Sequence, residues 1–275
     1  MRRNFKLQFF DNLMIVKRNK NTAELVGLSF GDGGLTYRKN TNRLRFQLRG
    51  HLIEDKEHYD EYIIPVFNKE IMIPIFDRAV GIVFNKNKGF YGLAVESTKI
   101  EKELNYLGIS SGVKKKLPIP DWIKDSKTYT KGFLRGFFDT DGSVSCQRNY
   151  SIKDNQFHTQ IRIYLACCSK NLMEQIYNSL LSLNFKCIFV ESKRQKWKDY
   201  YVVKLSGGIQ VKRWFEIIGS KNPKQVTKYQ IWKKFGFCSP YTTLKQRKET
   251  LKKGISPKYY YKRECRSGQT GQKGL

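Results

Sequence analysis

The sequence has few acidic residues and no long apolar run. Of its 275 residues 24 are Asp or Glu, against 52 Lys or Arg, which leaves a formal net charge of +28 at pH 7. No apolar stretch approaches the roughly 18 residues that a membrane span needs. The N-terminal region is interrupted by Asp11, Lys17 and Arg18 and does not have the pattern of a signal peptide. We therefore expect a cytoplasmic location, in a prokaryotic cell or the interior of an organelle.

Cysteine and histidine patterns argue against two common kinds of site. The six cysteines include no C-x-x-C pair, so we expect reduced thiols rather than disulfides. His51, His58 and His158 are too scattered in the sequence to predict a zinc site. What is abundant is basic charge, which attracts polyanions, so nucleic acid is the expected partner. An anionic membrane surface is the alternative, but no long basic amphipathic helix is present to bind it.

A nine-residue motif occurs twice in the chain. LVGLSFGDG spans residues 25–33 and LRGFFDTDG spans residues 134–142, and a constant offset of 109 aligns Asp32 with Asp141. Similarity at one fixed offset indicates a duplicated unit, here of domain size. Both motifs place a carboxylate at the end of an apolar, helix-like run, where the helix macrodipole disfavours it. Such a position suggests that the carboxylate is held there for a function.

The same order of elements is predicted after each motif. In the first copy we expect strands near 35–38, 43–49, 80–85 and 90–96, with helical segments near 58–67 and 97–107. In the second copy we expect strands near 143–148, 160–168, 186–191 and 200–205, and helices near 171–183, 210–218 and 224–235. The predicted fold is therefore α+β, with two pseudo-twofold-related αββαββα halves and antiparallel sheets.

These elements predict four regions. They are an N-terminal extension at 1–21, a first half at 22–120, a second half at 121–240 and a basic C-terminal tail at 241–275. In the tail a helix is expected near 243–253, and the composition of the last dozen or so residues is typical of disorder.

Small residues in the motifs predict that the two motif helices pack closely. Gly27 and Gly31 lie on one helical face, and so do Gly136 and Thr140. Small residues on one face let two helix backbones approach, and this contact offsets the cost of up to about 1 kcal/mol for Gly inside a helix. The last glycine of each motif is predicted to end its helix in the left-handed conformation.

Parallel packing of these helices would bring Asp32 and Asp141 side by side. Two carboxylates near two negative helix ends resist ionisation unless a cation lies between them. Mg²⁺ suits the pair, with the carbonyl groups of the preceding Gly31 and Thr140, water and substrate phosphate completing the shell. About two or three shared ions would activate a water and stabilise the leaving oxygen in phosphodiester hydrolysis. A single D-x-D-G is a weak signal, since Asp and Gly are common in turns, but the doubled motif is much stronger.

With these two motifs the chain resembles a single-chain LAGLIDADG homing endonuclease. LVGLSFGDG and LRGFFDTDG correspond to the nine-residue signature of that family, and the resemblance covers about residues 20–240. Phe30 stands where the family often has an acid, but the position of the metal ligand is Asp in both copies. The resemblance implies a monomer whose two saddle-shaped sheets straddle the major groove of double-stranded DNA. It also implies Mg²⁺-dependent cleavage of both strands at a long target.

The resemblance further implies which residues act. Basic and polar residues of the strands and hairpins would contact DNA, because Arg, Lys and Gln read base edges or grip phosphates. The expected contacts are Tyr37, Arg38, Arg43, Arg45, Gln47, Arg49, Lys86, Lys88, Arg148, Gln160, Arg162, Tyr164, Lys193, Arg194 and Lys196. A Lys or Gln near the metals often assists catalysis in this family, and we expect Lys114 and Lys221 to do so here.

Two other functions stay open at this point. Proteins that resemble this family sometimes assist splicing, so an RNA-binding intron maturase with precursor RNA as its partner is the main alternative. A nuclease-dead DNA-binding regulator is another. The Asp in both motifs favours cleavage, because binding alone does not require metal ligands.

Overall fold

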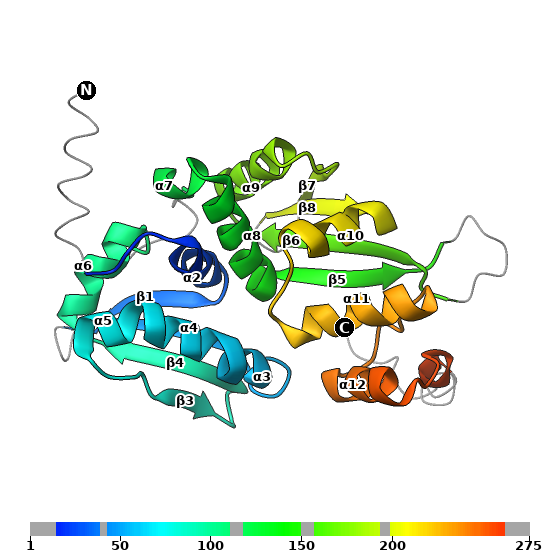
Figure 1. Cartoon of the computed structure of the whole chain (residues 1–275), viewed down its shortest axis with the longest axis horizontal. Coiled ribbons are helices and arrows are strands. Elements are labelled where there is room, and N and C mark those ends of the chain that lie inside the picture. The colour runs from blue at the N-terminus through cyan, green and yellow to red at the C-terminus, as the bar shows by residue number, and fades with distance from the viewer. Residues whose placement is uncertain (1–14, 39–42, 111–117, 150–156, 193–198, 262–275) are drawn as a thin grey trace.

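Two four-stranded antiparallel sheets, one after each motif, organise the chain (Figure 1). The computed structural model describes residues 15–38, 43–110, 118–149, 157–192 and 199–261. The first half contains α2 (Lys20–Gly31), β1 (Gly33–Arg38), β2 (Arg43–His51), β3 (Ile82–Asn85), β4 (Phe90–Glu96) and α6 (Thr98–Leu107). The second contains α7 (Asp121–Lys124), α8 (Lys127–Asp141), β5 (Gly142–Gln147), β6 (Gln160–Cys167), α9 (Lys170–Ser182), β7 (Ile188–Ser192), β8 (Tyr200–Ser206), α10 (Gly208–Ile217) and α11 (Pro223–Phe235).

The two sheets share one topology. The strand orders are β1-β2-β4-β3 and β5-β6-β8-β7, so each sheet has its second and fourth strands in the middle. Equivalent ladders begin at the pairs Gly33–Leu48 and Gly142–Leu165. The predicted α+β class and the repeated αββαββα order are confirmed.

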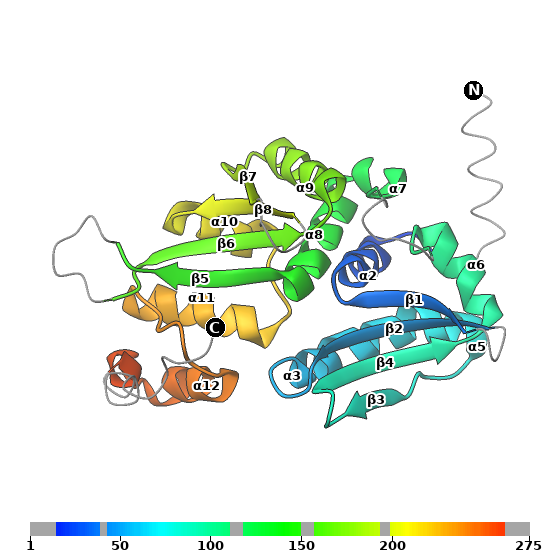
Figure 2. The ribbon, with the colours of Figure 1, turned by 180° about the vertical axis from the view of Figure 1, so that it is seen from behind.

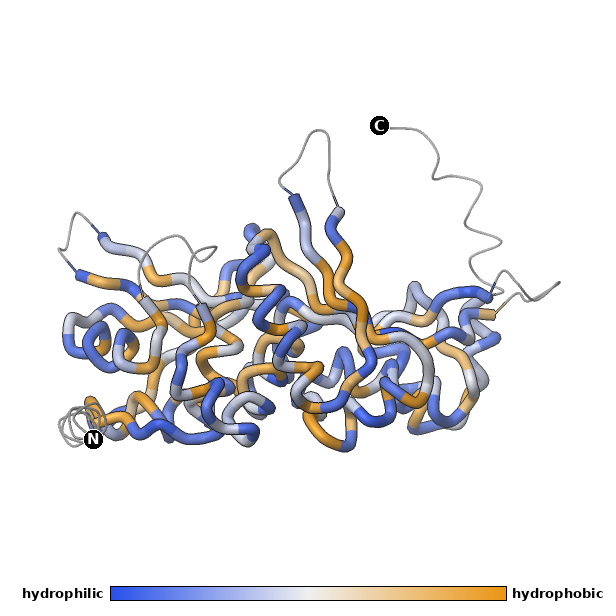
Figure 3. The backbone as a smooth tube through the Cα atoms, turned by 90° about the horizontal axis from the view of Figure 1, so that it is seen from above, coloured by the Kyte–Doolittle hydropathy of each residue, from blue (hydrophilic) through white to orange (hydrophobic). Residues whose placement is uncertain are grey.

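Alternating side chains decide which face of each sheet is covered. On β2, Leu44, Phe46 and Leu48 are each 1% exposed and join the core, while Arg45 and Gln47 between them point to the other face. Helices cover the apolar face of both sheets, and the two open faces point to the same side of the molecule (Figure 2). The strand ends that project from the body are mostly polar (Figure 3). None of the described helices is long and apolar enough to cross a membrane.

The helix between the two strand pairs of the first half is longer than predicted. It runs to Phe76 and alternates α-helical segments α3 (Lys56–His58), α4 (Ile64–Phe67) and α5 (Ile73–Phe76) with π-helical segments at Tyr59–Ile63 and Asn68–Met72. Each π-helical segment precedes an Ile-Pro pair, at Pro65 and Pro74. Proline lacks an N–H group and its ring crowds the carbonyl four residues earlier, so a locally wider turn relieves the helix.

The interface between the halves is built on α2 and α8, which pack backbone against backbone. A Cβ atom on Gly27 would lie 2.1 Å from the carbonyl oxygen of Phe133, and one on Gly136 would lie 2.1 Å from that of Glu24. These two contacts are equivalent, because adding the offset of 109 to residues 27 and 24 gives 136 and 133. A Cβ on Gly31 would lie 1.9 Å from Thr140 Oγ1. Close packing therefore explains the small residues of both motifs.

Gly27→Ala is expected to destabilise the protein, because the new methyl group meets backbone that cannot move aside. Overpacking of this kind costs about 1–3 kcal/mol of the free energy of unfolding. Gly81→Ala is the matched control, since a Cβ there has nothing within 4 Å. Urea denaturation of both variants measures the difference. Equal stability of the two variants would contradict the packing described here.

The backbone conformation of the glycines that end the two motifs differs from the prediction. Gly142 has φ −98° and ψ 167°, and Gly33 is not among the glycines with positive φ, so neither adopts the left-handed conformation. Both are glycine for steric reasons. A Cβ on Gly33 would lie 2.5 Å from Ser29 Cα, and one on Gly142 would lie 2.3 Å from the ring of Phe138. The chain turns from helix to strand directly over the last helical turn, which leaves no room for a side chain.

The predicted C-terminal helix forms α12 (Leu244–Lys253) and joins the two halves. Arg247 is 2% exposed. Its Nε donates to Thr227 Oγ1 on α11 at 3.0 Å, and its Nη2 lies 3.4 Å from Oε2 of Glu54 in the first half. The backbone N–H of Leu244 donates to the same carboxylate at 3.2 Å. This part of the predicted tail is therefore folded, and it contacts Glu54 of the first half and Thr227 of the second. The last dozen residues, whose composition predicts disorder, fall within 262–275 and so lie outside the described residues.

Candidate active site

The C-terminal ends of α2 and α8 meet, and each carries one motif aspartate. A Cβ on Gly31 would lie 3.4 Å from Cγ of Asp141, so the carboxyl group of Asp141 lies beside the residue that precedes Asp32. Asp32 caps α2, with its N–H donating to Leu28 O at 3.0 Å. Both aspartates are half-buried. Two carboxylates and the negative ends of two helices thus meet at one partly exposed site, where the C-terminal ends of α2 and α8 come together.

This place has the chemistry of a hard-cation site. Oxygen ligands from two carboxylates, with backbone carbonyl groups nearby, suit Mg²⁺ and similar ions. In the described part of the chain no group of three or more His, Cys, Asp or Glu side chains is arranged to hold a metal. A bound ion would therefore take protein ligands from Asp32 and Asp141 and complete its shell with backbone oxygens, water or substrate. The role of these two residues stays a prediction.

A buried tyrosine lies close to this place. Tyr59 is 1% exposed, and its hydroxyl has no hydrogen-bond partner among the described residues. Burial raises the pKa of Tyr59 well above its usual value, and the charges of Asp32 and Asp55 raise it further. The phenol therefore stays neutral near the first aspartate.

A buried ion pair crosses the helix interface nearer the start of α2. Arg135 Nε donates to Glu24 Oε1 at 2.8 Å, and its other nitrogen pairs with the second carboxylate oxygen. Tyr62 donates to Glu24 Oε2 at 2.8 Å and accepts from Arg135 at 3.1 Å. Glu24 is completely buried. Although burial alone would lower it, the pKa of Arg135 rises far above its usual value through Glu24, so the pair stays charged.

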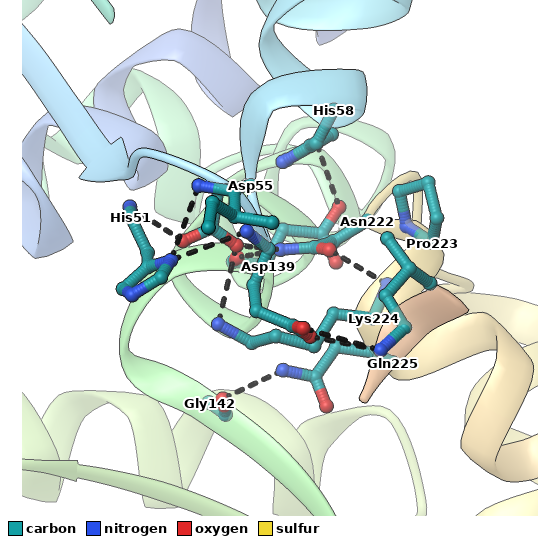
Figure 4. Close-up of polar contacts among 12 residues, drawn as sticks. His51, Asp55, His58, Asp139, Gly142, Asn222, Pro223, Lys224 and Gln225 are labelled. Atoms are coloured by element: carbon teal, nitrogen blue, oxygen red, sulfur yellow. Dashed lines mark hydrogen bonds and ion pairs between the residues drawn. The ribbon is translucent and has the colours of Figure 1, made fainter. Parts of the chain in front are cut away.

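Asp139 anchors a second polar cluster, two residues before Asp141 (Figure 4). Its carboxylate accepts from Ser220 Oγ and from the backbone N–H of Lys221 at 2.7 Å. The side chain of Asn222 donates to the carbonyl oxygen of Asp139 at 2.9 Å. His58 Nε2 lies 3.7 Å from the carboxylate. The cluster fixes the last turn of α8 against the loop before α11.

Asp55 extends this cluster to the first half. It accepts from Asn222 Nδ2 at 3.2 Å, from Lys224 Nζ at 3.1 Å and from the backbone N–H of His51 at 2.9 Å. Burial alone would raise the pKa of Asp55, but the Lys224 charge and the three hydrogen bonds lower it. Asp55 is therefore ionised and ties α11 to the loop after β2.

Gln225 holds the chain that directly follows Asp141. Its side chain is 1% exposed, accepts from the backbone N–H of Val144 at 2.8 Å and donates to Gly142 O at 3.1 Å. These bonds fix the turn from α8 into β5 and, with it, the direction of the second aspartate.

Two groups of the Asp139 cluster are expected to make stability depend on pH with opposite signs. Burial lowers the pKa of His58 to about 4, so His58 adds stability as pH rises from about 4 to about 6.5, where the unfolded chain loses its proton. Burial raises the pKa of Asp139 to about 7, so its contribution is present below about 3.8 and is lost as pH rises to about 7. Each slope is at most about 1.4 kcal/mol per pH unit.

Single variants separate the two contributions. In His58→Gln the free energy of unfolding should fall as pH rises from about 4 to 7, whereas in Asp139→Asn it should rise from about 4 to 6.5. The unmodified protein should have a flatter profile than either variant. Urea titrations across this range provide the measurement. Identical profiles for all three proteins would show that neither group titrates as its surroundings require.

The structure places one of the two predicted catalytic lysines. Lys221 is exposed, and its Nζ lies 5.5 Å from the centroid of the Tyr62 ring, which belongs to the Glu24–Arg135 group. Lys114 lies outside the described residues. Both remain predictions. Lys224, which no sequence pattern indicated, pairs with Asp55 at 3.1 Å in the cluster that contains Asp139.

Most of the DNA contacts predicted for the first half share the open face of its sheet. Arg38, Arg43, Arg45, Gln47 and Arg49 lie there by register. Gln47 lies beside Gly34, two residues beyond Asp32, since a Cβ on Gly34 would lie 3.2 Å from Gln47 Nε2. Tyr37 pairs with Leu44 and so alternates to the other face, although it is 55% exposed. The structure therefore does not bring Tyr37 together with the arginines.

The remaining predicted contacts are spread over strands and turns. Gln160, Arg162 and Tyr164 share the open face of the second sheet. Arg148 lies one residue beyond the end of β5, and Lys86 and Lys88 lie in the exposed turn between β3 and β4. Lys193, Arg194 and Lys196 lie outside the described residues. All of these assignments stay predictions.

No sequence motif indicates the residues that fix the end of α8 and the loop before α11. Asp55, Asn222, Lys224 and Gln225 occur in no repeated motif, and their long-range hydrogen bonds join residues 81 to 169 positions apart. The one available signal was the Asn222-Pro223 pair, which is typical of a helix start.

The architecture now identifies the fold. Two motif helices that pack at the interface of two αββαββα halves, each with a four-stranded antiparallel sheet, form the LAGLIDADG homing endonuclease fold. Residues 128–219, in the second half, match the family described as LAGLIDADG-like domain.

Particular solved structures share this fold. The structure of I-DmoI in complex with DNA and Mn is 19% identical, with a TM-score of 0.51 over 73% of this chain and 96% of that chain. Mesophilic variants of the homing endonuclease I-DmoI give 18% identity and a TM-score of 0.50, over 73% of this chain and 95% of that chain. A double mutant of I-SmaMI is 12% identical, with a TM-score of 0.51 over 94% of this chain and 100% of that chain.

Proposed function

We propose that this protein is a site-specific endonuclease that cuts both strands of DNA as a homing endonuclease. The observation that carries this proposal is the meeting of α2 and α8, which sets one carboxylate from each half at a single place between two open sheet faces. Neither half alone has both carboxylates. A site shared by two related halves suits a duplex, whose two strands are themselves related by a pseudo-twofold axis.

The residues have separate tasks in this proposal. Asp32 and Asp141 hold divalent metal, with the carbonyl groups of Gly31 and Thr140 as further candidate ligands. When bound, the metal would lower the pKa of an attacking water and stabilise the leaving oxygen. The Asp139 cluster and Gln225 keep the end of α8 in place, so that the second carboxylate is held without reorganisation.

The rest of the chain suits a long polyanion. The net charge of +28 attracts DNA. By register the open faces carry basic and polar residues, and both faces point to the same side of the molecule (Figure 2). Among structures with the same fold, I-DmoI is in complex with DNA and Mn. Binding of DNA and of divalent metal by this chain is proposed on these grounds.

The test measures cleavage of a DNA duplex by the purified protein. In this duplex the sequences that flank the protein's own gene are joined directly to each other. Specific double-strand cutting in Mg²⁺, with binding but no cutting in Ca²⁺, is the expected result. Random-sequence duplex of equal length is the control. Binding of precursor RNA with no cutting of DNA would overturn the proposal in favour of a splicing role. Specific binding without cutting would make the protein a regulator.

A further inference from the structure

A hollow on the surface of the second half shares no residue with the two motif helices. It measures about 670 Å³ and lies where the end of α9, the start of β7, the end of β8 and the start of α10 come together (Figure 1). Phe185, which is 2% exposed, lines it together with Leu181, Ile188 and Ile209. Its size falls within the range of about 300–1,000 Å³ that is typical of binding sites.

Hydrogen bonds hold the walls of the hollow in place. Gln210 Oε1 accepts from the backbone N–H of Lys186 at 2.9 Å, and Arg213 Nη2 donates to Leu183 O at 3.1 Å. These bonds tie α10 to the loop between α9 and β7 at two points. The guanidinium of Arg213 also lies 5.4 Å from the centroid of the Phe185 ring. The hollow therefore exists before a ligand arrives, and little ordering cost opposes binding.

The apolar side chains that border the hollow lie largely in water. Ile209 is 83% exposed, Ile188 is 50% exposed and Leu181 is 43% exposed. Single exposed aliphatic side chains are common, but several beside one hollow form a patch of the kind that marks an interaction site. A small molecule inside the hollow would leave Ile209 in water. A partner that also covers the border buries all three side chains, which favours a protein surface over a small ligand.

The charged residues that line the hollow have one sign. Lys186 and Lys204 are among the lining residues, and no Asp or Glu is. A partner that buries this surface must therefore supply negative charge, or the two ammonium groups lose water without compensation. A second copy of this chain does not suit, because two molecules with a net charge of +28 repel each other.

The first half has no equivalent of this surface. On the matched ladders Lys204, opposite Tyr164, corresponds to Ala94, and the place of Ile188 is taken by Gly81, just before β3. A Cβ on Gly81 would have nothing within 4 Å. A role that both halves share therefore does not explain the hollow. Its border does adjoin the open face of the second sheet, because Lys204 and Tyr164 lie on that face by register.

We propose that this surface binds another protein through an acidic amphipathic segment. The surface, called here the α9–α10 surface, consists of Leu181, Lys186, Ile188, Lys204 and Ile209. An apolar side chain of the partner enters the hollow, its neighbours cover Ile209, and its carboxylates pair with the two lysines. Nucleic acid suits this surface less well, because phosphates over apolar side chains lose hydrogen bonds with water and gain none. A lipid surface is flat and does not fill a hollow.

The test selects binders from a library of random peptides displayed on phage. The whole protein is the bait, and each round removes the peptides that also bind the Ile209→Asp variant, so attraction to the general positive charge is discarded. Enriched sequences should combine apolar residues at the helical spacing i, i+3 and i+4 with Asp and Glu. Enriched sequences without acidic residues would overturn the proposal. So would the absence of any peptide that distinguishes the two proteins.

Affinities of a selected peptide for single variants test the contacts. Ile209→Ser should weaken binding about tenfold or more, because the apolar contact is lost. Ile53→Ser is the matched control, since Ile53 is 73% exposed in the first half, and it should leave the affinity unchanged. Lys186→Gln and Lys204→Gln should each weaken binding about two- to fivefold, whereas Lys102→Gln, at an exposed position of α6, should not. Equal effects of the two isoleucine variants would refute the proposal.

Two further measurements separate this proposal from its alternatives. Vesicles of phosphatidylglycerol and phosphatidylcholine should not bind through Ile209; vesicle binding that Ile209→Ser abolishes would overturn the proposal in favour of a lipid surface. Cleavage of DNA by Ile209→Ser should equal that of the unmodified protein. Because peptide binding is measured without DNA, loss of the proposed endonuclease function would leave this result intact, and the reverse also holds.

Discussion

Asp32→Asn and Asp141→Asn are each expected to slow DNA cleavage by about 10³-fold or more, because a metal contributes several kcal/mol to the transition state. Asparagine keeps the size of the side chain and removes the anionic ligand. DNA binding in Ca²⁺ should change little, since most of the proposed DNA contacts lie on the sheet faces and away from the two aspartates. The free energy of unfolding should stay the same or rise by about 0.3–1 kcal/mol, because each change removes a negative charge from a helix C-terminus.

Asp125→Asn is the matched control for these variants. Asp125 is exposed and precedes α8, so the same change of charge occurs at the opposite end of the same helix. Its cleavage rate should equal that of the unmodified protein. Cleavage measured under single-turnover conditions, with urea denaturation alongside, distinguishes the outcomes. Full cleavage by either motif variant would reject the shared metal site, and loss of folding would make the aspartates structural.

Glu24→Leu and Arg135→Met are each expected to lower the free energy of unfolding by about 3–5 kcal/mol. Glu24 is completely buried, and the Arg135 side chain is 11% exposed. Removing one partner leaves the charge of the other buried, out of contact with water and without a counter-charge. Burying an unpaired charge costs more than the pair itself contributes, so a single substitution has the larger effect.

The combined variant decides whether the charge or the shape is responsible. Glu24→Leu, Arg135→Met and Tyr62→Phe together remove every polar group of the cluster and should recover most of the lost stability. Denaturation of the two single variants and of the combined variant completes the comparison. Additive losses would show that packing volume, rather than an unpaired charge, sets the cost.

This ion pair also breaks the symmetry of the helix interface. On the 109-residue offset, Glu24 corresponds to Phe133 and Arg135 to Val26, so the pair occurs once across the interface. If α2 packed on α2 of a second copy, Glu24 would face Val26 and stay buried without its partner. The pair therefore favours association of the two halves within one chain, in one register.

The sequence predicted the parts of this fold that have a local signal. The glycines of both motifs, the alternation along β2, and the order of strands and helices all follow from periods of two or about 3.6 residues. Their boundaries agree with the structure to within a few residues, except that the helix predicted to end near residue 67 runs on to Phe76. The conformation of Gly33 and Gly142 was predicted wrongly, because a helix-ending glycine usually adopts positive φ, whereas here crowding by Ser29 and Phe138 decides the residue.

By itself, then, the sequence determined that there are two related halves, and that each contributes one aspartate at the end of a close-packed helix. Tertiary structure alone decided which side chains support those ends. Asp55 pairs with Lys224, and Glu54 pairs with Arg247, so each ion pair joins the first half to the second half or to the C-terminal helix. Such contacts join residues far apart in the chain. No local periodicity predicts them, because they depend on how the two halves pack against each other.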